Sequence, residues 1–362
     1  MGEDRNIKII PEYISILKAA YKTKSTSIVK QALNKEFNQE MKFDVIIGNP
    51  PYQETTGGGK GGGGNTLYDK FVSAGIDMSE RYASFVVPAR WYTDETRVKS
   101  LREKLINTPN MVEIHDFPDT DDLFKGVWIM GGVCYFLWDN QYNGMCRFVE
   151  HRSGNIVENI RALKSDYSDV IIRNSRAISL VEKVLGKKEH KLDEYIFDYN
   201  IFKLRSYERG TENKIHEDDL IMYYTGNESR GGGYGYVKRK FITDGTELID
   251  KHKIYINSVS DNMLSFPYKV LYPAFYGAPG TVCTESYLVI GPILDKRYAE
   301  PIIKYLKTKF VKALVIQCKT SQTSYKRVYK FVPYQDFTES SDIDWDKSVD
   351  DIDKQLYEKY NL

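Results

Sequence analysis

One stretch, Phe43-Asp44-Val45-Ile46-Ile47-Gly48-Asn49-Pro50-Pro51-Tyr52, constrains the fold of this chain more than any other. Its β-branched run, 45–47, is typical of a strand that is buried on both faces, and Gly48 ends that strand. The two prolines hold φ at about −65°, disfavour helix before them and remove two N–H donors. The sequence therefore predicts a stiff turn that holds the Asn49 carboxamide at the C-terminal end of a central strand, with the ring of Tyr52 beside it.

The groups in this turn suit chemistry on an amino group. An amide oxygen and a main-chain carbonyl both accept hydrogen bonds from an exocyclic amine, and an aromatic ring stacks on the planar base that carries the amine. The structural alternative is a proline-rich turn after a core strand, which needs no ligand.

The Asn49-Pro50-Pro51-Tyr52 tetrapeptide, after a strand of the pattern Asp-apolar-apolar-apolar-Gly, resembles the catalytic motif of the amino-methyltransferases, above all the adenine-N6 DNA methyltransferases. The resemblance implies that Asn49 and the Pro50 carbonyl bind the N6 amine of a flipped adenine and that Tyr52 stacks on the base. It also implies double-stranded DNA as the substrate and S-adenosylmethionine as the cofactor, with Asn49 and Leu67 in contact with the cofactor. Enzymes that methylate a glutamine amide or a guanine N2 in RNA share the tetrapeptide and are an alternative.

Residues 42–140 are similar to the second half of the methylase domain in bifunctional type IIG restriction-modification proteins. The similarity rests on a Leu67-Tyr68 helix, a strand that ends in Pro88-Ala89-Arg90-Trp91 and a Gly131–Phe136 strand. In that family the catalytic turn follows the fourth strand of a Rossmann-like sheet, and the first three strands carry most of the cofactor site. No glycine-rich cofactor turn of the family's type occurs on either side of Asn49. Three explanations stay open: a partner subunit supplies that half, the chain is a fragment, or it is a DNA-binding specificity module without catalysis.

The remaining pattern predicts α/β organisation. Helical spacing at 9–37 and 67–78, extended runs at 82–87 and 111–117, a helix at 96–106 and an apolar strand at 128–138 give the alternation of an α/β sheet. We expect residues 42–140 to form part of a mixed or parallel sheet with helices packed on it. Helices are also predicted at 175–185, 298–316 and 349–360. Together with this pattern, the resemblance to the type IIG family implies a partial Rossmann-like methyltransferase domain over 1–150, a linker and helix over 151–190, and a mixed α+β target-recognition domain over 191–362. Phe124 or Trp128 either lines the far side of the adenine pocket or packs in the core.

Several basic and aromatic segments are candidate DNA contacts. The glycine-rich segment 57–64 around Lys60 is either a mobile loop or a lid over DNA, and it lacks the Ser or Thr that a Walker A loop needs. Segments 230–240 and 319–330 combine positive charge with tyrosines, and the alternative for the first is a solvated surface hairpin. The candidate DNA-binding residues are Lys60, Arg90, Arg230, Tyr234, Lys238, Arg239, Lys240, Tyr325, Lys326, Arg327 and Lys330. Trp91, beside Arg90 at the end of a strand, is a further candidate ligand contact.

Composition sets the remaining limits. The chain has 51 Lys and Arg against 50 Asp and Glu, so any nucleic-acid surface must be local. Its four cysteines lack CxxC spacing, which indicates neither a zinc site nor a disulfide framework and favours a reducing cytoplasm. No apolar run has the length of a membrane span, and no nuclease pattern stands out.

Overall fold

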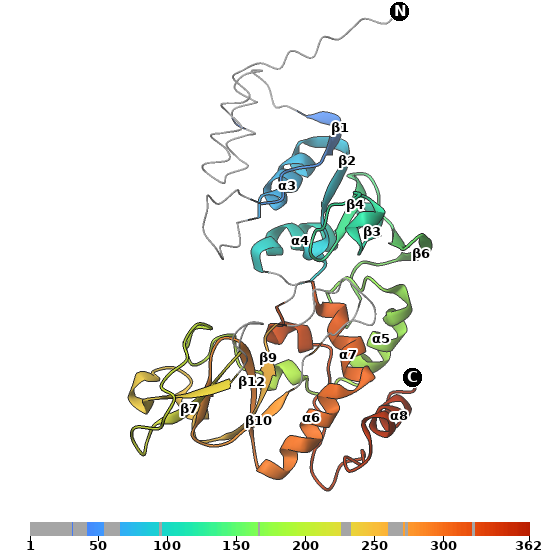
Figure 1. The fold of residues 1–362 in the computed structure, drawn as a ribbon. Helices are drawn as coiled ribbons and strands as arrows, with labels where there is room; N and C mark the ends of the chain where they lie inside the picture. The colour runs from blue at the N-terminus through green and yellow to red at the C-terminus, as the bar shows by residue number, and fades with distance from the viewer. Residues whose placement is uncertain are drawn as a thin grey trace, which may run out of the picture. The chain divides into compact units, whose positions relative to one another are not determined.

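The computed structural model describes residues 31, 42–53, 66–93, 96–165, 167–225, 233–259, 271, 274–320 and 323–362. The chain folds into two compact units, Met1–Ile171 (unit 1) and Ile172–Leu362 (unit 2) (Figure 1). Three predicted features lie outside the described residues: most of the helical segment 9–37, the glycine-rich segment 57–64 with Lys60, and Arg230.

Unit 1 is built on a mixed six-stranded sheet. Its strands are β1 (Phe43–Gly48), β2 (Ser79–Pro88), β3 (Met111–Phe117), β4 (Val133–Asp139), β5 (Cys146–Arg152) and β6 (Asn155–Arg161). Their order across the sheet is β1-β2-β4-β3-β5-β6. The β1/β2 and β3/β5 pairs are parallel, and the other three pairs are antiparallel. The predicted α/β class is confirmed, and of the two predicted arrangements, mixed or parallel, the sheet is mixed, because β4 runs against both of its neighbours.

Two helices cover one face of this sheet. They are α3 (Tyr68–Met78) and α4 (Lys99–Ile106), the second preceded by a 3-10 turn at Thr96–Val98. Gly75 allows α3 to pack closely, because a Cβ at this position would lie 2.3 Å from the Phe85 ring. Both helices share one core with the inward residues of the strands. The helices contribute Tyr68, Val72, Ile76, Leu101 and Leu105. The strands contribute Ala83, Phe85, Val87, Ile114, Phe136 and Phe148.

Strand β1 lies at the edge of the sheet among the described residues, and the expectation of a central strand buried on both faces is wrong for them. Ile46 packs against the α3 side, whereas Val45 and Ile47 are 51% and 79% exposed. A strand is buried on both faces only when both faces are covered, and α3 covers only one. The apolar strand predicted at 128–138 is also shorter, since β4 begins at Val133.

Unit 1 extends beyond the expected boundary near residue 150. Strand β5 pairs with β3, and β6 returns beside β5 through a two-residue turn, Ser153-Gly154, in which both residues have positive φ. These strands add to the sheet of unit 1, so the unit ends at Ile171.

Unit 2 contains two small sheets. One has the order β10-β9-β12, and the other has the order β11-β7-β8. The strands are β7 (Leu220–Tyr224), β8 (Gly233–Val237), β9 (His252–Asn257), β10 (Phe275–Gly277), β11 (Thr281–Cys283) and β12 (Tyr287–Ile293). Leu220, Met222, Tyr255, Val282 and Val289 from both sheets share one core, so the two sheets pack together.

Four helices complete the described part of unit 2. They are α5 (Ile178–Gly186), α6 (Ala299–Lys307), α7 (Lys309–Val315) and α8 (Val349–Lys359). The predicted helices at 175–185 and 349–360 are confirmed. The single helix predicted at 298–316 is two helices, because Thr308 adopts an extended conformation and its hydroxyl accepts a hydrogen bond from the Val311 amide at 3.2 Å.

Candidate functional site

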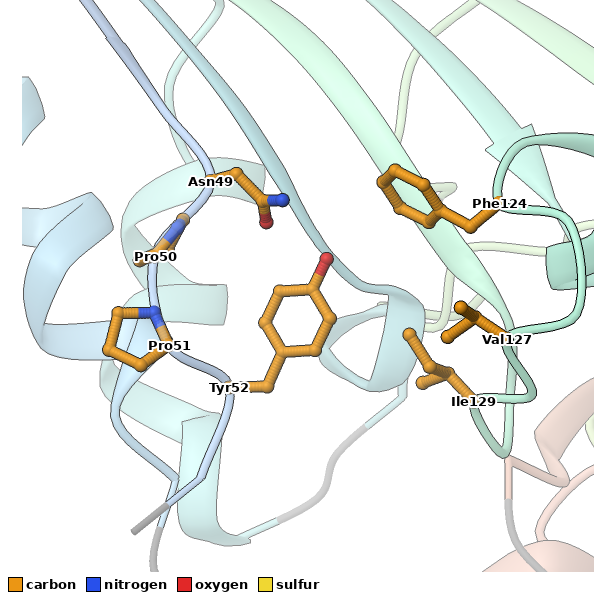
Figure 2. Close-up of a pocket in the computed structure, with 7 residues that line it drawn as sticks. All are labelled: Asn49, Pro50, Pro51, Tyr52, Phe124, Val127 and Ile129. Carbon is orange, nitrogen blue, oxygen red and sulfur yellow. The ribbon is translucent and has the colours of Figure 1, made fainter. Parts of the chain in front are cut away.

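A pocket of about 590 Å³ lies at the carboxyl end of β1. This volume falls within the range of about 300–1,000 Å³ that small-molecule sites occupy. One wall is the turn Asn49–Tyr52, and the other is formed by Phe124, Val127 and Ile129. Figure 2 shows the Asn49 carboxamide and the Tyr52 ring directed toward the space between the two walls. The structure therefore brings the predicted turn together with a second wall that lies more than seventy residues later in the sequence.

Tyr52 is held at the boundary of the core. Its ring makes an edge contact with the buried ring of Tyr68, with centroids 6.5 Å apart, and it packs against the unit 1 core. Burial, followed by the nearby Cys134 thiol, raises the pKa of the Tyr52 phenol above its usual value of 10.0. The ring therefore stays neutral and offers an apolar face to the pocket.

Asn49 has the hydrogen-bonding capacity that a bound amine needs. The residue is exposed, and no described residue forms a hydrogen bond with its carboxamide. Pro50 is buried, which anchors the turn behind Asn49. Because a carboxamide has both an acceptor oxygen and two N–H donors, Asn49 can accept a hydrogen bond from an amino group in the pocket.

The opposite wall belongs to a well-braced loop between β3 and β4. The Thr120 carbonyl accepts from the Phe124 amide at 2.7 Å, and the Thr120 hydroxyl accepts from the Ile129 amide at 3.2 Å. Asp121 Oδ1 accepts from the Gly126 amide at 2.7 Å. These contacts fix the loop that presents Phe124, Val127 and Ile129.

The sequence predicted only one of the three residues in this wall. Of the two aromatics considered for the far side of the pocket, Phe124 lines it, whereas Trp128 is 50% exposed and is not part of the lining. Val127 and Ile129 were missed. The sequence signal for this wall was the group Gly126, Gly131 and Gly132, which indicates an irregular loop between strands. In the structure all three glycines have positive φ values.

The pocket residues do not form a complete site for S-adenosylmethionine. Its lining contains one carboxamide, one phenol, two prolines and three apolar side chains, with no carboxylate and no cation. A nucleoside with an amino-acid tail needs charged partners and a hydroxyl-binding acid, and the pocket lining provides neither. Leu67, predicted to contact the cofactor, is 5% exposed and lies outside the lining, so its role stays a prediction.

The residues predicted at the end of β2 have different environments. Trp91 is fully buried, and its indole N–H donates to the Cys134 sulfur at 3.4 Å. Trp91 is therefore a core residue, and the expectation that it contacts a ligand is wrong. Arg90 is half-buried in the 3-10 turn Ala89–Tyr92, and its DNA-binding role stays a prediction.

In unit 2, the described part of segment 230–240 is a hairpin strand and the turn after it. Tyr234 on β8 is 57% exposed, and Lys240 is exposed with its Nζ 5.7 Å from the centre of the Phe241 ring. Arg239 forms an ion pair with Asp250, with one Nη to Oδ2 distance of 3.0 Å. Lys238 and Lys240 thus have more freedom than Arg239 to meet a phosphate.

Segment 319–330 is partly built into unit 2. Val328 and Tyr329 are buried, and Lys319 is buried with its Nζ 2.9 Å from the Ser324 hydroxyl. The predicted DNA contacts of this segment lie nearer the surface. Lys326 forms an ion pair with Asp198 at 3.3 Å, and Lys330 is half-buried. The Arg327 guanidinium lies 4.9 Å from the centre of the Tyr325 ring.

None of the described helices is long and apolar enough to cross a membrane.

The first part of the chain is similar to known methylases. Residues 3–124 match the family described as Eco57I restriction-modification methylase. A protein of Mycoplasma pneumoniae (strain ATCC 29342 / M129 / Subtype 1) named "Uncharacterized adenine-specific methylase" is 42% identical over 106 residues, which cover 29% of this chain and 25% of that protein.

Solved restriction-modification structures are also similar to this chain. The type IIL enzyme MmeI in complex with DNA has a TM-score of 0.44 and 11% identity, over 84% of this chain and 52% of that one. The type IIG endonuclease BpuSI has a TM-score of 0.31 and 11% identity, over 88% of this chain and 49% of that one. The chain thus spans a quarter of the curated relative and about half of these structures. Residues 3–124 are thus similar to the Eco57I restriction-modification methylase family, and the relative from Mycoplasma pneumoniae carries the name of an adenine-specific methylase, a similarity that the residues around Asn49 predicted.

Proposed function

We propose that this chain is the base-binding component of an adenine-N6 DNA methyltransferase from a restriction-modification or DNA modification system. The observation that carries the proposal is the Asn49 carboxamide, which lacks a described hydrogen-bond partner and faces a pocket between Tyr52 and Phe124. The Asn49–Tyr52 wall of this pocket and Phe124 lie in the region that matches the methylase family. Adenine carries an exocyclic amine on a flat apolar ring, which matches an acceptor amide between two aromatic side chains.

Each residue of the turn has a separate task in this proposal. Asn49 and the Pro50 carbonyl accept hydrogen bonds from the N6 amine, which orients its lone pair for attack on a methyl group. Tyr52 stacks on the flipped base, while Phe124 limits the other side of the pocket. Pro50 and Pro51 hold φ and keep the acceptor groups in place without reorganisation.

S-adenosylmethionine is the proposed methyl donor, and residues outside this pocket must complete its site, because the pocket lining holds no charged group. A partner subunit that carries the cofactor-binding half meets this requirement. Double-stranded DNA is the proposed substrate, and the basic surfaces of unit 2 around Lys238, Lys240 and Lys326 are its proposed target-recognition contacts. We place the protein in the cytoplasm, where its DNA substrate lies and where its four free cysteines remain reduced.

A non-catalytic specificity module is the competing function. The incomplete cofactor site favours it, because a chain that binds DNA but no methyl donor can still direct a partner to its target sequence. The two functions differ in what they require of Asn49, which is needed for methyl transfer but not for DNA binding.

Sequencing that detects N6-methyladenine in genomic DNA tests the proposal in cells that carry the chain in its natural context. One sequence motif should be methylated, and Asn49→Ala should abolish that methylation. Asn107→Ala is the matched control, since Asn107 is another exposed asparagine of unit 1. Methylation that survives Asn49→Ala would exclude the catalytic role and favour the specificity module.

A further inference from the structure

Trp128 differs from the other three tryptophans of the chain. Trp91, Trp138 and Trp345 are 0%, 3% and 6% exposed, and each donates its indole N–H to a neighbouring residue. Trp128 is 50% exposed, and among the described residues its indole has neither a hydrogen-bond partner nor a ring contact. Its ring therefore neither lines the pocket nor packs in the core, which were the two positions considered from the sequence. A large ring of this kind is enriched where proteins contact their ligands.

Tight turns hold the backbone on both sides of Trp128. The Val127 amide donates to the Phe124 carbonyl at 3.1 Å. The Gly132 amide donates to the Ile129 carbonyl at 2.9 Å. The backbone from which the indole projects is therefore fixed before a ligand binds, so little ordering entropy is lost on binding.

Trp128 lies at the rim of the pocket. Its two neighbours, Val127 and Ile129, both line the pocket, and Figure 2 shows them facing Tyr52. Strands β1 and β3 run in the same direction, because β1 is parallel to β2, and both β2 and β3 are antiparallel to β4. The turn after β1 and the loop after β3 thus leave the sheet at one edge. An exposed residue between two lining residues of that loop lies beside the mouth of the pocket.

A DNA duplex must cross this mouth if a flipped adenine enters the pocket, and this step rests on the proposed function. Extrusion of a base leaves an empty position in the stack, and the flanking bases lose their contacts there. Proteins that open or kink DNA insert apolar side chains between base steps, and an aromatic ring recovers stacking with the bases. Lys125, three residues before Trp128, is exposed and 3.4 Å from Asp121, a weak surface pair that a phosphate can replace.

We propose that Trp128 is the wedge of this methyltransferase: its indole enters the duplex and fills the position in the stack that the flipped adenine leaves. Phe124 and Trp128 belong to one braced loop, so the wall of the base pocket and the wedge approach the DNA together. Filling the gap lowers the free energy of the extruded state. Trp128 is therefore a positioning residue, which promotes base flipping without contact with the reacting amine.

A duplex with a pyrene nucleotide opposite the target adenine tests the wedge. Pyrene fills the space of a whole base pair, so the adenine is extruded without help from the protein. Methyl transfer is measured with the enzyme purified from cells that carry the chain, on its methylated motif. On the unmodified duplex, Trp128→Ala should lower kcat/KM by roughly 5- to 150-fold, the range for loss of one base–aromatic stack. On the pyrene duplex the variant should be within about threefold of wild type.

Related substitutions separate a flat ring from apolar area. Trp128→Phe keeps a ring that can stack and should retain more activity on the unmodified duplex than Trp128→Leu. Ile160→Ala is the matched control, since Ile160 is 71% exposed on β6 and lies opposite Arg147, near the amino end of β5 and away from the pocket. All of these variants should keep the wild-type melting temperature, because both side chains are exposed.

Tryptophan fluorescence gives a second measurement on the same residue. The emission of Trp128, taken as the difference between wild type and Trp128→Phe, should decrease when the motif duplex binds, because stacked bases quench an indole. The emission of an exposed tryptophan introduced by Ile160→Trp in the Trp128→Phe background should not change. Emission from Trp128 that is unchanged by the motif duplex would overturn the proposal.

Asn49→Ala distinguishes failure of the wedge from failure of the proposed function. It should be inactive on both duplexes, because pyrene cannot replace an acceptor of the adenine amine. If Asn49→Ala is inactive while Trp128→Ala has wild-type activity on the unmodified duplex, or is impaired equally on both duplexes, only the wedge is wrong. If Asn49→Ala transfers methyl groups as well as wild type, the proposed function is wrong and the wedge is excluded with it.

Discussion

The backbone amide of Leu67 donates a hydrogen bond to the Tyr52 carbonyl at 3.2 Å, and this contact closes the base of segment 54–65. Gln53 and Thr66 form an antiparallel bridge directly beside it. We call these two contacts, Leu67 with Tyr52 and Gln53 with Thr66, the neck of the segment. The neck connects the pocket residue Tyr52 directly to the start of α3. The two contacts therefore tie the Asn49–Tyr52 turn to the start of α3.

Shortening the glycine-rich segment should hardly change folding stability. Deletion of Gly61–Gly64 leaves the neck intact, and loop-closure entropy varies only slowly with loop length, by about 0.6 kcal/mol for each doubling. Urea unfolding of the deletion variant should give a free energy of unfolding within about 1 kcal/mol of wild type. A larger loss would mean that the segment makes stabilising contacts of its own.

Substitutions of Tyr52 should separate its ring from its hydroxyl. No described residue hydrogen-bonds to the hydroxyl, so Tyr52→Phe should keep methyl transfer within about threefold of wild type. Tyr52→Ala removes the stacking surface, worth about 1–3 kcal/mol per base, and should lower kcat/KM of the complete enzyme by roughly 5- to 150-fold. Equal losses in the two variants would contradict a stacking role.

His115 and His151, a pair on the face of the sheet opposite α3, should make unit 1 sensitive to acid. His115 Nδ1 lies 2.9 Å from His151 Nε2, so the pair cannot be doubly protonated and remain hydrogen-bonded. Burial lowers the pKa of both side chains below 6.5, although Glu113 opposes this for His115 and Asp116 opposes it for His151. Below pH 6.5 the two histidines therefore bind more protons in the unfolded chain than in the folded chain. The free energy of unfolding falls as the pH decreases.

Thermal melts from about pH 8 to about pH 5 measure this effect. His151→Gln should reduce the acid-induced decrease in melting temperature. The control His216→Gln, at an exposed position of unit 2, should leave the decrease unchanged. An identical pH profile for His151→Gln and wild type would remove the pair as its cause.

Lys253 should be essential to the stability of unit 2. Its side chain is fully buried, and its Nζ donates to the carbonyls of Leu248, Ile249, Lys251 and Ala278 at 2.9, 3.1, 2.8 and 3.2 Å. Lys253→Met preserves much of the apolar stem but leaves these carbonyls without that donor. We expect a loss of about 2–3 kcal/mol in the free energy of unfolding, measured by denaturant titration. A neutral effect would show that other donors or water replace the ammonium.

Charge reversal in unit 2 should alter the salt dependence of DNA binding. Lys238→Glu together with Lys240→Glu should weaken duplex binding and reduce the slope of log affinity against log salt by about one for each phosphate that the variant no longer neutralises. Arg239 is left intact because of its ion pair with Asp250. Lys307→Glu, an exposed change elsewhere in unit 2, is the control. An unchanged slope would exclude these lysines from the DNA interface.

Local sequence determined a large part of what the structure contains. The β-branched residues before Gly48 specify a strand, and the prolines after Asn49 specify the turn, because both effects act on neighbouring residues. Helical periodicity likewise predicted α3, α4, α5 and α8 to within a few residues. The motif around Asn49 was also sufficient to indicate the methylase family.

Only the tertiary structure decided which residues meet and which faces remain open. Phe124, Val127 and Ile129 reach the pocket because β1, β2 and β4 are neighbours in the sheet, an order that no local pattern encodes. The ion pair with Asp250 likewise separates Arg239 from the adjacent lysines. Nor does a run of β-branched residues, which is typical of a buried strand, reveal that β1 lies at the edge of the described strands with Ile47 exposed. The spacing of apolar residues predicts which side chains are buried, whereas the arrangement of the strands and helices determines which elements pack against them.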